Sequence, residues 1–439
     1  MNQQGMRACA ERLEQFLSSL LVPVGRAERR QHGKTYIQGL LLDGERKSIE
    51  PMAARVPASN VQALQQFVGQ SPWAWEPVRK LLAQQMSERL LPTAAWIVDD
   101  TGFPKQGSES VGVARQYSGT LGKVGNCQVA VSVHLTTPEE SLPLHGALYL
   151  PESWLAERER CRKVGIPEDT PFRTKPALAL ELIDQLLGWG LEAQPIWAEV
   201  AYGNDTGFRQ ALAARRLRYV VGVQSTTTAW PVPARQVQPR RPRPQKIGRP
   251  RGAYYPERPK SVEQLARAGR SSDWRTVRWR PGSRGVQESR FAACRVQPAH
   301  GPLRHGGEPE TLWLLIEWPE EAAAPSHYWL SNLPAHVSRR CLVQLAKLRW
   351  RVEQNYQQLK EELGLDHYEG RGWQGWHHHV TWVSLAYAFL VSERLQDKKT
   401  PPPPLPEVRR CLQQVLIRMF GSCPLGRQRW PSGKSRHPT

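Results

Sequence analysis

Short apolar runs and helically spaced apolar residues alternate through the middle of the chain. The runs are typical of strands and lie at 94–98, 127–135, 142–150, 194–198 and 218–223. Between the last three runs, apolar residues spaced by three or four positions predict helices at 176–190 and 206–216. The order of three strands, helix, strand, helix and strand predicts an α/β protein with a mixed sheet.

The first 92 residues have a different pattern, which predicts a helical N-terminal region. Helical spacing of apolar residues is found at 9–21, 61–67 and 73–91. Two interpretations of residues 1–92 stay open. The region is either a domain that binds DNA ends or dimerises, or a helical cap packed on the sheet.

An uninterrupted helix is predicted over 338–362, where neither glycine nor proline occurs, and Gly364 is suited to end it. On such a helix Arg349, Glu353 and Lys360 fall within about 60° of one another, so one carboxylate lies between two cations. This stripe is either an Arg–Glu pair on a solvated face or part of a functional site.

Acidic residues that end two of the predicted strands favour a functional site. Asp99 and Asp100 follow the first apolar run, and Glu199 follows the run at 194–198. The carboxyl ends of strands are where sites gather in α/β sheets. Asp205, six residues after Glu199, is instead suited to cap the next helix.

The charge of the chain favours a polyanionic partner. Sixty Lys and Arg against 40 Asp and Glu give a net charge of +20, which favours nucleic acid and, after it, an anionic membrane surface. No run of 18 apolar residues predicts a membrane span, and the first residues lack an apolar signal core. The seven cysteines are scattered without a CxxC pair, so we expect reduced thiols in a cytoplasmic protein, with neither a zinc site nor disulfides.

Much of the excess charge lies in one segment. Residues 235–295 contain 17 Lys or Arg and four Asp or Glu, and their later part alternates like strands around Trp274 and Trp279. Basic residues interleaved with Trp suit phosphate neutralisation and stacking on bases. The alternative is a solvated basic loop whose two Trp belong to the core.

Two other segments each allow more than one interpretation. The glycine-rich segment 107–125, with Lys105, Arg115 and Lys123 in or beside it, is either a basic loop that contacts DNA backbone or a long hairpin. The three adjacent histidines at 377–379 resemble metal ligands, but neighbours in sequence rarely converge on one ion. We therefore expect that they are packed inside or contact DNA.

Three motifs together resemble a known family. They are Asp99-Asp100-Thr101-Gly102, Ala198-Glu199-Val200-Ala201-Tyr202-Gly203 and Arg349-x3-Glu353-x6-Lys360, in a region from about 93 to 382. This set resembles the DDE-type insertion-sequence transposases, cut-and-paste enzymes with an RNase H-like catalytic domain. The last motif resembles the tyrosine–arginine–glutamate–lysine signature of that group, with Ala346 in the place of the tyrosine. Glu199 stands where the family has Asp.

The resemblance implies a fold and a chemistry. The implied fold is an RNase H-like mixed sheet with a basic, β-rich insertion, and the implied cofactor is Mg²⁺ (two ions, with Mn²⁺ as an alternative). The implied catalytic and metal-binding residues are Asp100, Glu199 and Glu353, with Asp99 as a second candidate for the first position. The residues expected to contact DNA are Arg349, Lys360, Lys105, Arg115, Lys123, Trp274 and Trp279.

The implied reaction cuts phosphodiester bonds at the ends of a mobile element and joins the 3′-hydroxyl ends to target DNA. The implied partners are the terminal inverted repeats and target DNA, with a homodimer assembled on DNA, in the bacterial cytoplasm near the nucleoid. The departures at Glu199 and Ala346 leave an alternative open, a catalytically weakened or silent relative that binds DNA. The expected divisions are 1–92 (helical), 93–224 (core, first part), 225–320 (basic insertion), 321–398 (core, second part) and 399–439 (basic tail).

Overall fold

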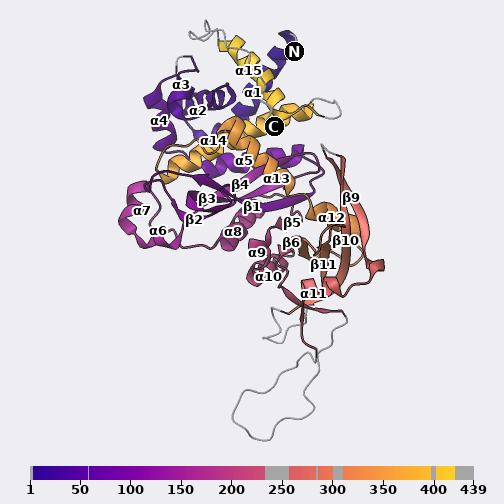
Figure 1. Ribbon diagram of the computed structural model, residues 1–439. Coiled ribbons are helices and arrows are strands. Elements are labelled where there is room, and N and C mark those ends of the chain that lie inside the picture. The colour runs from indigo at the N-terminus through magenta and orange to yellow at the C-terminus, as the bar shows by residue number, and fades with distance from the viewer. Residues whose placement is uncertain are drawn as a thin grey trace, which may run out of the picture.

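The fold is built on one long mixed sheet with helices on its faces, as the computed structural model in Figure 1 shows. The structure describes residues 3–57, 59–232, 257–282, 285–299, 310–396 and 402–420. The strands follow the order β2-β3-β1-β5-β6-β12-β11-β10-β7-β8, with β4 paired to β3 and β9 paired to β10.

The first half of the sheet has the RNase H-like arrangement. β3 pairs antiparallel with β1 and β4, whereas β5 and β6 run parallel to β1. The strands are β1 (Ala95–Pro104), β2 (Ala114–Ser118), β3 (Lys123–Thr136), β4 (Ser141–Tyr149), β5 (Ile196–Ala198) and β6 (Tyr219–Val223). Between β4 and β6 lie α6 (Glu152–Ala156), α7 (Arg158–Val164), α8 (Lys175–Gly188), α9 (Val200–Gly203) and α10 (Thr206–Ala214). The predicted α/β fold is confirmed, and the predicted strands occur in the expected order. β2 is an additional strand, and it forms a hairpin with β3 in the glycine-rich segment.

Strands between 228 and 331, among them those of the basic segment, extend this same sheet. β12 pairs antiparallel with β6, and β11, β10 and β7 continue outward from it. The elements are β7 (Thr228–Pro231), β8 (Lys260–Ser261), α11 (Val262–Arg267), η2 (Ser271–Asp273), β9 (Arg275–Gly282), β10 (Gly285–Pro298), β11 (Leu312–Glu317) and β12 (His327–Ser331). The insertion is thus β-rich, as expected. The domain limits stay a prediction, because the sheet continues across 224 and 320, and residues 233–256 lie outside the described part.

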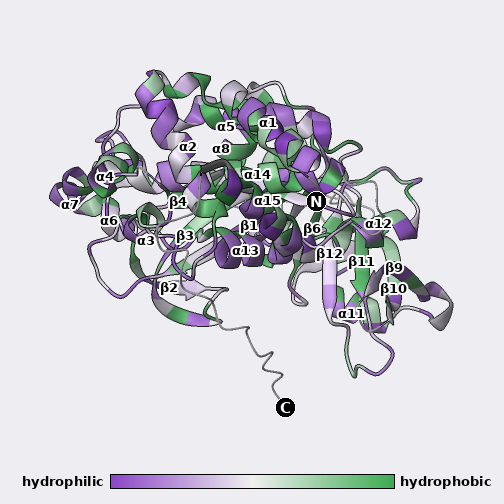
Figure 2. Cartoon of the chain, turned by 90° about the horizontal axis from the view of Figure 1, so that it is seen from above, coloured by the Kyte–Doolittle hydropathy of each residue, from purple (hydrophilic) through white to green (hydrophobic). Residues whose placement is uncertain are grey.

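The N-terminal helices and the last helices of the chain gather on one side of the sheet (Figure 1). They are α1 (Gln3–Leu20), η1 (Val22–Val24), α2 (Ala27–Leu41), α3 (Ile49–Ala53), α4 (Val61–Gly69), α5 (Trp75–Arg89), α14 (Trp373–Gln396) and α15 (Leu405–Phe420). α14 is buried along most of its length and packs against α2, α4, α5 and β4. Figure 2 shows hydrophobic residues along α14 and the neighbouring strands, with hydrophilic residues on the outer helices.

This packing is that of a helical cap on the core, and a DNA-binding role for 1–92 stays a prediction. The sequence pattern missed α2, whose two glycines and charged residues obscure its apolar face, and it missed α15 in the tail. No helix in the described part of the chain is long and apolar enough to cross a membrane.

The helix predicted over 338–362 is two helices. α12 (Arg339–Ala346) and α13 (Trp350–Leu363) are separated by a turn at 347–349. Tertiary contact stabilises the break, because the indole Nε1 of Trp197 donates to the carbonyl oxygen of Ala346 at 3.1 Å. That carbonyl would otherwise accept from within a continuing helix. Gly364 ends α13 in the left-handed conformation (φ 65°), as predicted.

Candidate acidic site at the centre of the sheet

Three elements bring acidic side chains to the middle of the sheet. β1 and β5 run parallel and their pairing ends at Val98 and Ala198. The residues that follow are Asp99 and Asp100 on one strand and Glu199 on the other, so the acids lie side by side. β1 itself continues to Pro104 along β3, so the two Asp lie within the strand and not at its end.

A close backbone approach fixes the turn after Glu199. A Cβ on Gly203 would lie 2.0 Å from the carbonyl oxygen of Gly222 in β6, so only glycine fits. α9 can therefore pack directly on the sheet, and Glu199 occupies its N-cap position. Asp205 caps the next helix, since its Oδ1 accepts from the backbone N–H of Phe208 at 3.1 Å. This agrees with the role predicted for Asp205.

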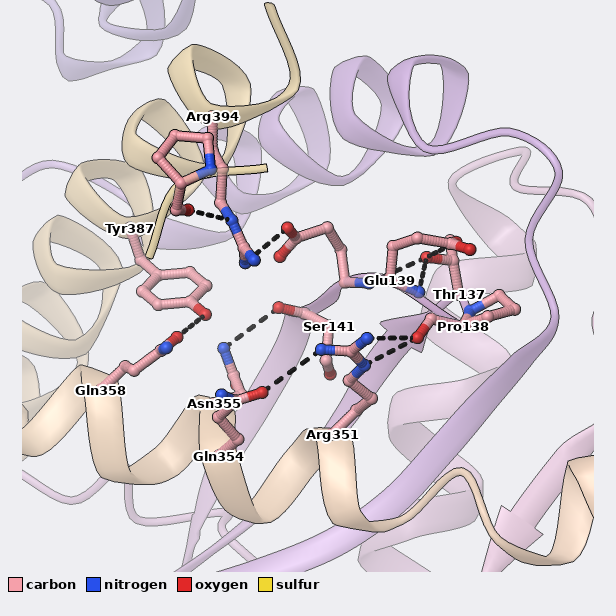
Figure 3. Close-up of polar contacts among 12 residues, drawn as sticks. Thr137, Pro138, Glu139, Ser141, Arg351, Gln354, Asn355, Gln358, Tyr387 and Arg394 are labelled. Carbon is pink, nitrogen blue, oxygen red and sulfur yellow. Dashed lines mark hydrogen bonds and ion pairs between the residues drawn. The ribbon is translucent and has the colours of Figure 1, made fainter. Parts of the chain in front are cut away.

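Polar contacts on the far side of α13 fix the helix that carries Glu353 (Figure 3). Arg351 Nε donates to the carbonyl oxygen of Pro138 at 2.8 Å, and Asn355 Nδ2 donates to that of Ser141 at 3.1 Å. One turn further, the hydroxyl of Tyr387 in α14 donates to Gln358 Oε1 at 2.7 Å. These residues tie α13 to the β3–β4 turn and to α14, so Glu353 faces the acidic cluster from a rigid support.

The guanidinium of Arg349 lies among three carboxylates of the site. Its Nη1 is 2.5 Å from Glu199 Oε1 and 3.0 Å from Glu353 Oε1. Its Nε is 3.7 Å from Asp99 Oδ2. The i,i+4 pair expected between Arg349 and Glu353 is present, but it belongs to a larger network in which one cation bridges acids from β1, β5 and α13.

Burial leaves the charge of Asp99 poorly compensated. Its side chain is 5% exposed, and burial raises the pKa of Asp99 to about 8, with Arg349 opposing the rise and Glu199 and Asp100 adding to it. Burial also raises the pKa of Glu199, again opposed by Arg349. A buried cluster of acids with raised pKa values is typical of functional sites and favours binding of a further cation.

Asp100 has a different partner, which the sequence did not predict. Lys175 Nζ, at the start of α8, lies 2.7 Å from Asp100 Oδ2, and both side chains are about a quarter exposed. Successive side chains of a strand point to opposite faces, so Asp99 meets Arg349 of α13 while Asp100 meets α8. The sequence near Lys175 indicated only that a helix starts there, because Thr174 is suited to cap it. Thr174 Oγ1 accepts from Ala177 N–H at 3.3 Å.

The remaining cations predicted to contact DNA fall into two groups. Lys360 Nζ donates to the carbonyl oxygen of Gly102 at 3.0 Å and to Thr120 Oγ1 at 2.9 Å. Lys105 Nζ donates to the carbonyl oxygen of Tyr368 at 2.6 Å. Burial lowers the pKa of both lysines. Lys360 thus ties α13 to β1, and Lys105, just after β1, ties that strand to the segment between α13 and α14. DNA contact by either lysine stays a prediction. The second group, Arg115 and Lys123, is exposed on the β2–β3 hairpin.

The two tryptophans of the basic segment are half-buried and packed on neighbours. Trp274 meets Trp318 edge to face at 5.5 Å, and Trp279 meets Phe291 at 5.7 Å. The ammonium of Lys347 lies 4.9 Å from the Trp279 ring. This packing supports the core interpretation of both rings, and stacking on a DNA base stays a prediction.

A second aromatic feature at the start of α13 was missed by the sequence interpretation. The Trp350 ring lies between two guanidinium groups, with Arg280 at 3.8 Å and Arg351 at 4.0 Å. These contacts join β9 of the basic segment to the helix that carries Glu353.

The three histidines at 377–379 are buried in α14 and do not converge. His378 bonds to the carbonyl oxygens of Val68 and Trp73, and His379 bonds to Tyr36. The packed-inside interpretation is therefore what the structure shows. Over the residues that the structure describes, no group of three His, Cys, Asp or Glu is arranged so that it could hold a metal ion.

The strand order and the acids at its centre define an RNase H-like protein. Comparison with family models identifies it more closely: the chain belongs to the DDE superfamily endonucleases, whose model matches residues 17–286. The match includes the N-terminal helices from the end of α1 onward, Asp99, Asp100 and Glu199, and it ends before Glu353.

A curated relative and a solved structure show what this chain is similar to. A probable transposase for insertion sequence element IS701 from Microchaete diplosiphon is 31% identical over 202 residues, which are 46% of this chain and 50% of the relative. The chain thus matches about half the length of that relative. A piggyBac transposase synaptic complex with hairpin DNA, studied by cryo-EM, aligns with 90% of this chain and 72% of its own at 11% identity, with a TM-score of 0.45.

Proposed function

We propose that this protein is a DNA transposase that cuts phosphodiester bonds at the ends of a mobile element and joins the freed 3′-hydroxyl ends to target DNA. The observation that carries the proposal is the convergence of Asp99, Glu199 and Glu353 on Arg349. Asp100, the next residue of β1, is held by Lys175 on the other side of the strand. Family membership and the similarity to a probable transposase support it.

The donor chemistry of the site suits divalent metal ions. Asp100, Glu199 and Glu353 supply the hard carboxylate oxygens that Mg²⁺ prefers. The pKa of Asp99 is raised by burial first and by the neighbouring acids Glu199 and Asp100 after it. The oxygens of Glu199 and Glu353 are directed at Arg349, so that side chain must give way before an ion binds. Lys175 orients Asp100 through its Oδ2. Bound Mg²⁺ ions would supply charge neutralisation at the phosphate and activation of the attacking oxygen.

The protein's own residues have three roles in this proposal. Asp100, Glu199 and Glu353 hold the ions, with Asp99 as the buried alternate to Asp100. Arg349, once released from the acids, binds a DNA phosphate through its planar fork of donors. The basic segment neutralises phosphates further along the DNA, and a homodimer on the paired ends completes the proposed assembly.

Cleavage of an authentic element end tests the proposal. The full chain is incubated with labelled terminal inverted repeats and Mg²⁺ or Mn²⁺, and nicked products are measured. Asp100→Asn and Glu353→Gln are expected to abolish cleavage while DNA binding survives, because each removes a metal-binding charge and no phosphate contact. Glu361→Gln, on the same helix outside the cluster, is the matched control. Full cleavage by Asp100→Asn or Glu353→Gln would contradict the assignment.

One observation favours a second function, that of a DNA-binding protein with little or no catalysis. Arg349 Nη1 lies within 3.0 Å of both Glu199 and Glu353, and the longer Glu199 in place of Asp is what reaches it. A site closed by its own arginine would bind DNA without cutting it. Sequence-specific binding of the ends with no cleavage in Mg²⁺ or Mn²⁺, by the native chain and by Glu199→Asp, would establish this function instead.

A further inference from the structure

A cavity of about 250 Å³ lies between α5, α8, α14 and β4, and none of the acids of the candidate site lines it. Its charged and polar lining includes Arg79, His145 and His377. Since these three side chains come from α5, β4 and α14, the cavity joins the N-terminal helices to the sheet.

Arg79 is a buried cation without a buried acid. Its residue is 3% exposed, and its hydrogen bonds go to neutral oxygens, namely Thr381 Oγ1 at 2.8 Å and the carbonyls of Gly146 and His377 at 2.6 and 3.0 Å. Among the described residues no carboxylate forms an ion pair with it. The acid whose charge acts on Arg79 is Glu76, which is exposed. Buried charges are normally paired. A guanidinium has five N–H donors, and the three hydrogen bonds of Arg79 leave two of them for a ligand.

Two buried histidines at the same cavity have unused ring nitrogens. His377 is 3% exposed, and neither of its ring nitrogens has a hydrogen-bond partner in the described part of the chain. His145 is 6% exposed; its Nε2 bonds to Gln185, and its Nδ1 has no such partner. Burial lowers the pKa of both, so each ring is neutral. The Nε2 of His145 donates to Gln185 Oε1, so its Nδ1 is an acceptor, whereas the His377 ring keeps one donor and one acceptor.

The walls of the cavity are largely apolar and aromatic. The Trp75 ring stacks on His377 at 4.5 Å with an interplanar angle of 6°, and Trp373 meets the same imidazole edge to face at 4.3 Å. Leu178 and Leu182 of α8 also line the space. A cavity of roughly 150 Å³ holds benzene in a known case, so this one has room for a ring with a charged group.

We propose that this cavity binds a small organic carboxylate, with its anionic group against Arg79 and its apolar body against Trp75 and Trp373. The N–H of the neutral His377 ring supplies a further hydrogen bond to the carboxylate end. The acids at the cavity do not take this position: Glu181 is bonded to Arg173, and Glu76 is exposed. Ligand binding would stabilise the junction of α5, α14 and β4, and this holds whether or not the chain cleaves DNA.

The test is a binding measurement on the purified full chain with three probes. Benzoate is the carboxylate, benzamide is its neutral isostere, and inorganic phosphate is an anion without an apolar body. Benzoate is expected to raise the melting temperature in a saturable way and to give heat in titration calorimetry. Benzamide and phosphate are expected to leave the melting temperature unchanged at the same concentrations. Equal shifts with benzoate and benzamide, a shift with phosphate alone, or no saturable shift with benzoate would overturn the proposal.

Two variants assign the binding to this cavity. Arg79→Met keeps the length of the side chain but removes its charge, and it is expected to weaken benzoate binding by at least about tenfold. Glu76→Gln, which removes the nearby negative charge at an exposed position, is expected to bind benzoate more tightly than the native chain. If Arg79→Met does not fold, Glu76→Gln still decides the matter, since unchanged or weaker benzoate binding by it contradicts a carboxylate at Arg79.

Discussion

Arg349 Nη1 lies 2.5 Å from Glu199 Oε1, so the residue that we propose for the second acidic position is paired with the arginine of the neighbouring motif. The pair is about one third exposed on each side. An aspartate at 199, shorter by one methylene, would draw its oxygens back toward β5. The contact thus links two features of the sequence, the substituted acid and the arginine four residues before Glu353.

Glu199→Asp is expected to raise Mg²⁺-dependent cleavage of element ends. A misplacement of about 1 Å in a reacting geometry can cost roughly 100-fold in rate, and Mg²⁺ is strict about octahedral geometry. The native chain should therefore be slow in Mg²⁺ and relatively faster in Mn²⁺, and the variant should narrow that difference. Initial cleavage rates in the two metals measure it.

Asp205→Ala is the control for the position of the second acid. Because Asp205 caps α10, its loss should lower the free energy of unfolding by about 1 kcal/mol and leave the cleavage rate of folded protein unchanged. If Asp205→Ala abolishes cleavage while Glu199→Asp has no effect, Asp205 is the second acid and the assignment of Glu199 is wrong.

Arg349→Ala is expected to strengthen metal binding without DNA and to weaken DNA binding. The variant removes the cation that now satisfies three carboxylates, so the affinity for Mn²⁺ should rise by about tenfold or more, because one charge-assisted contact amounts to about 1.5–3 kcal/mol. Loss of one phosphate contact should reduce the salt dependence of DNA binding by about one unit in log–log slope. Calorimetry with Mn²⁺ and DNA binding at several salt concentrations give both quantities.

Arg340→Ala, at an exposed position of α12, is the matched control for the loss of one arginine. It should leave the affinity for Mn²⁺ unaltered. An Arg349→Ala protein that binds Mn²⁺ no better than the native chain would show that the guanidinium does not compete with metal.

The sequence predicted the acids of the site better than their surroundings. Apolar runs followed by Asp99 and Glu199 are local patterns, so the strands could be predicted, but β1 continues past the two Asp to Pro104 along β3. The partner of Asp100 could not be predicted, because the contact with Lys175 depends on how α8 lies across the sheet. The break before Trp350 depends likewise on the indole of Trp197, which is distant in sequence. The sequence pattern of one element does not predict which other element packs against it.

The same limit explains the basic segment. Alternation around Trp279 correctly predicted a strand, but it could not show that the ring packs on Phe291 in β10. The continuity of the sheet from β6 through β12 arises from pairing between segments that are about a hundred residues apart. The spacing of residues within a segment does not predict such pairing. Helix ends such as Gly364 were predictable because their cause is local.

Lys175→Met is expected to slow cleavage by about tenfold or more and to leave DNA affinity unchanged. Lys175 holds Asp100 through a charge-assisted contact of 2.7 Å, and loss of such a contact, about 1.5–3 kcal/mol, would let the carboxylate turn away. Lys175→Arg keeps the charge and should restore part of the rate. A fall in DNA affinity with a smaller salt slope would instead make Lys175 a phosphate contact.

Buried histidines are expected to make the protein much less stable in mild acid. Burial lowers the pKa of His134 and His145 to about 3 and that of His378 and His379 to about 4, against an ordinary value of 6.5. Between these values the unfolded chain binds protons that the folded chain does not. Stability is therefore fully present above pH 6.5 and is lost as the pH falls toward 4.

The magnitude follows from proton linkage, since each such histidine contributes up to about 1.4 kcal/mol per pH unit. Urea unfolding at intervals from pH 7.5 to about pH 5 should give a slope that approaches several protons per molecule. His379→Gln should lower the free energy of unfolding at pH 7, because it disturbs the contact with Tyr36, and it should also reduce the acid slope by about one proton. His336→Gln, a control at an exposed position, should leave the pH dependence of the free energy of unfolding as it is in the native chain. A native chain whose stability is the same at pH 7 and pH 5 would mean that these imidazoles accept protons in the folded state, and hence that water reaches the packing around α14.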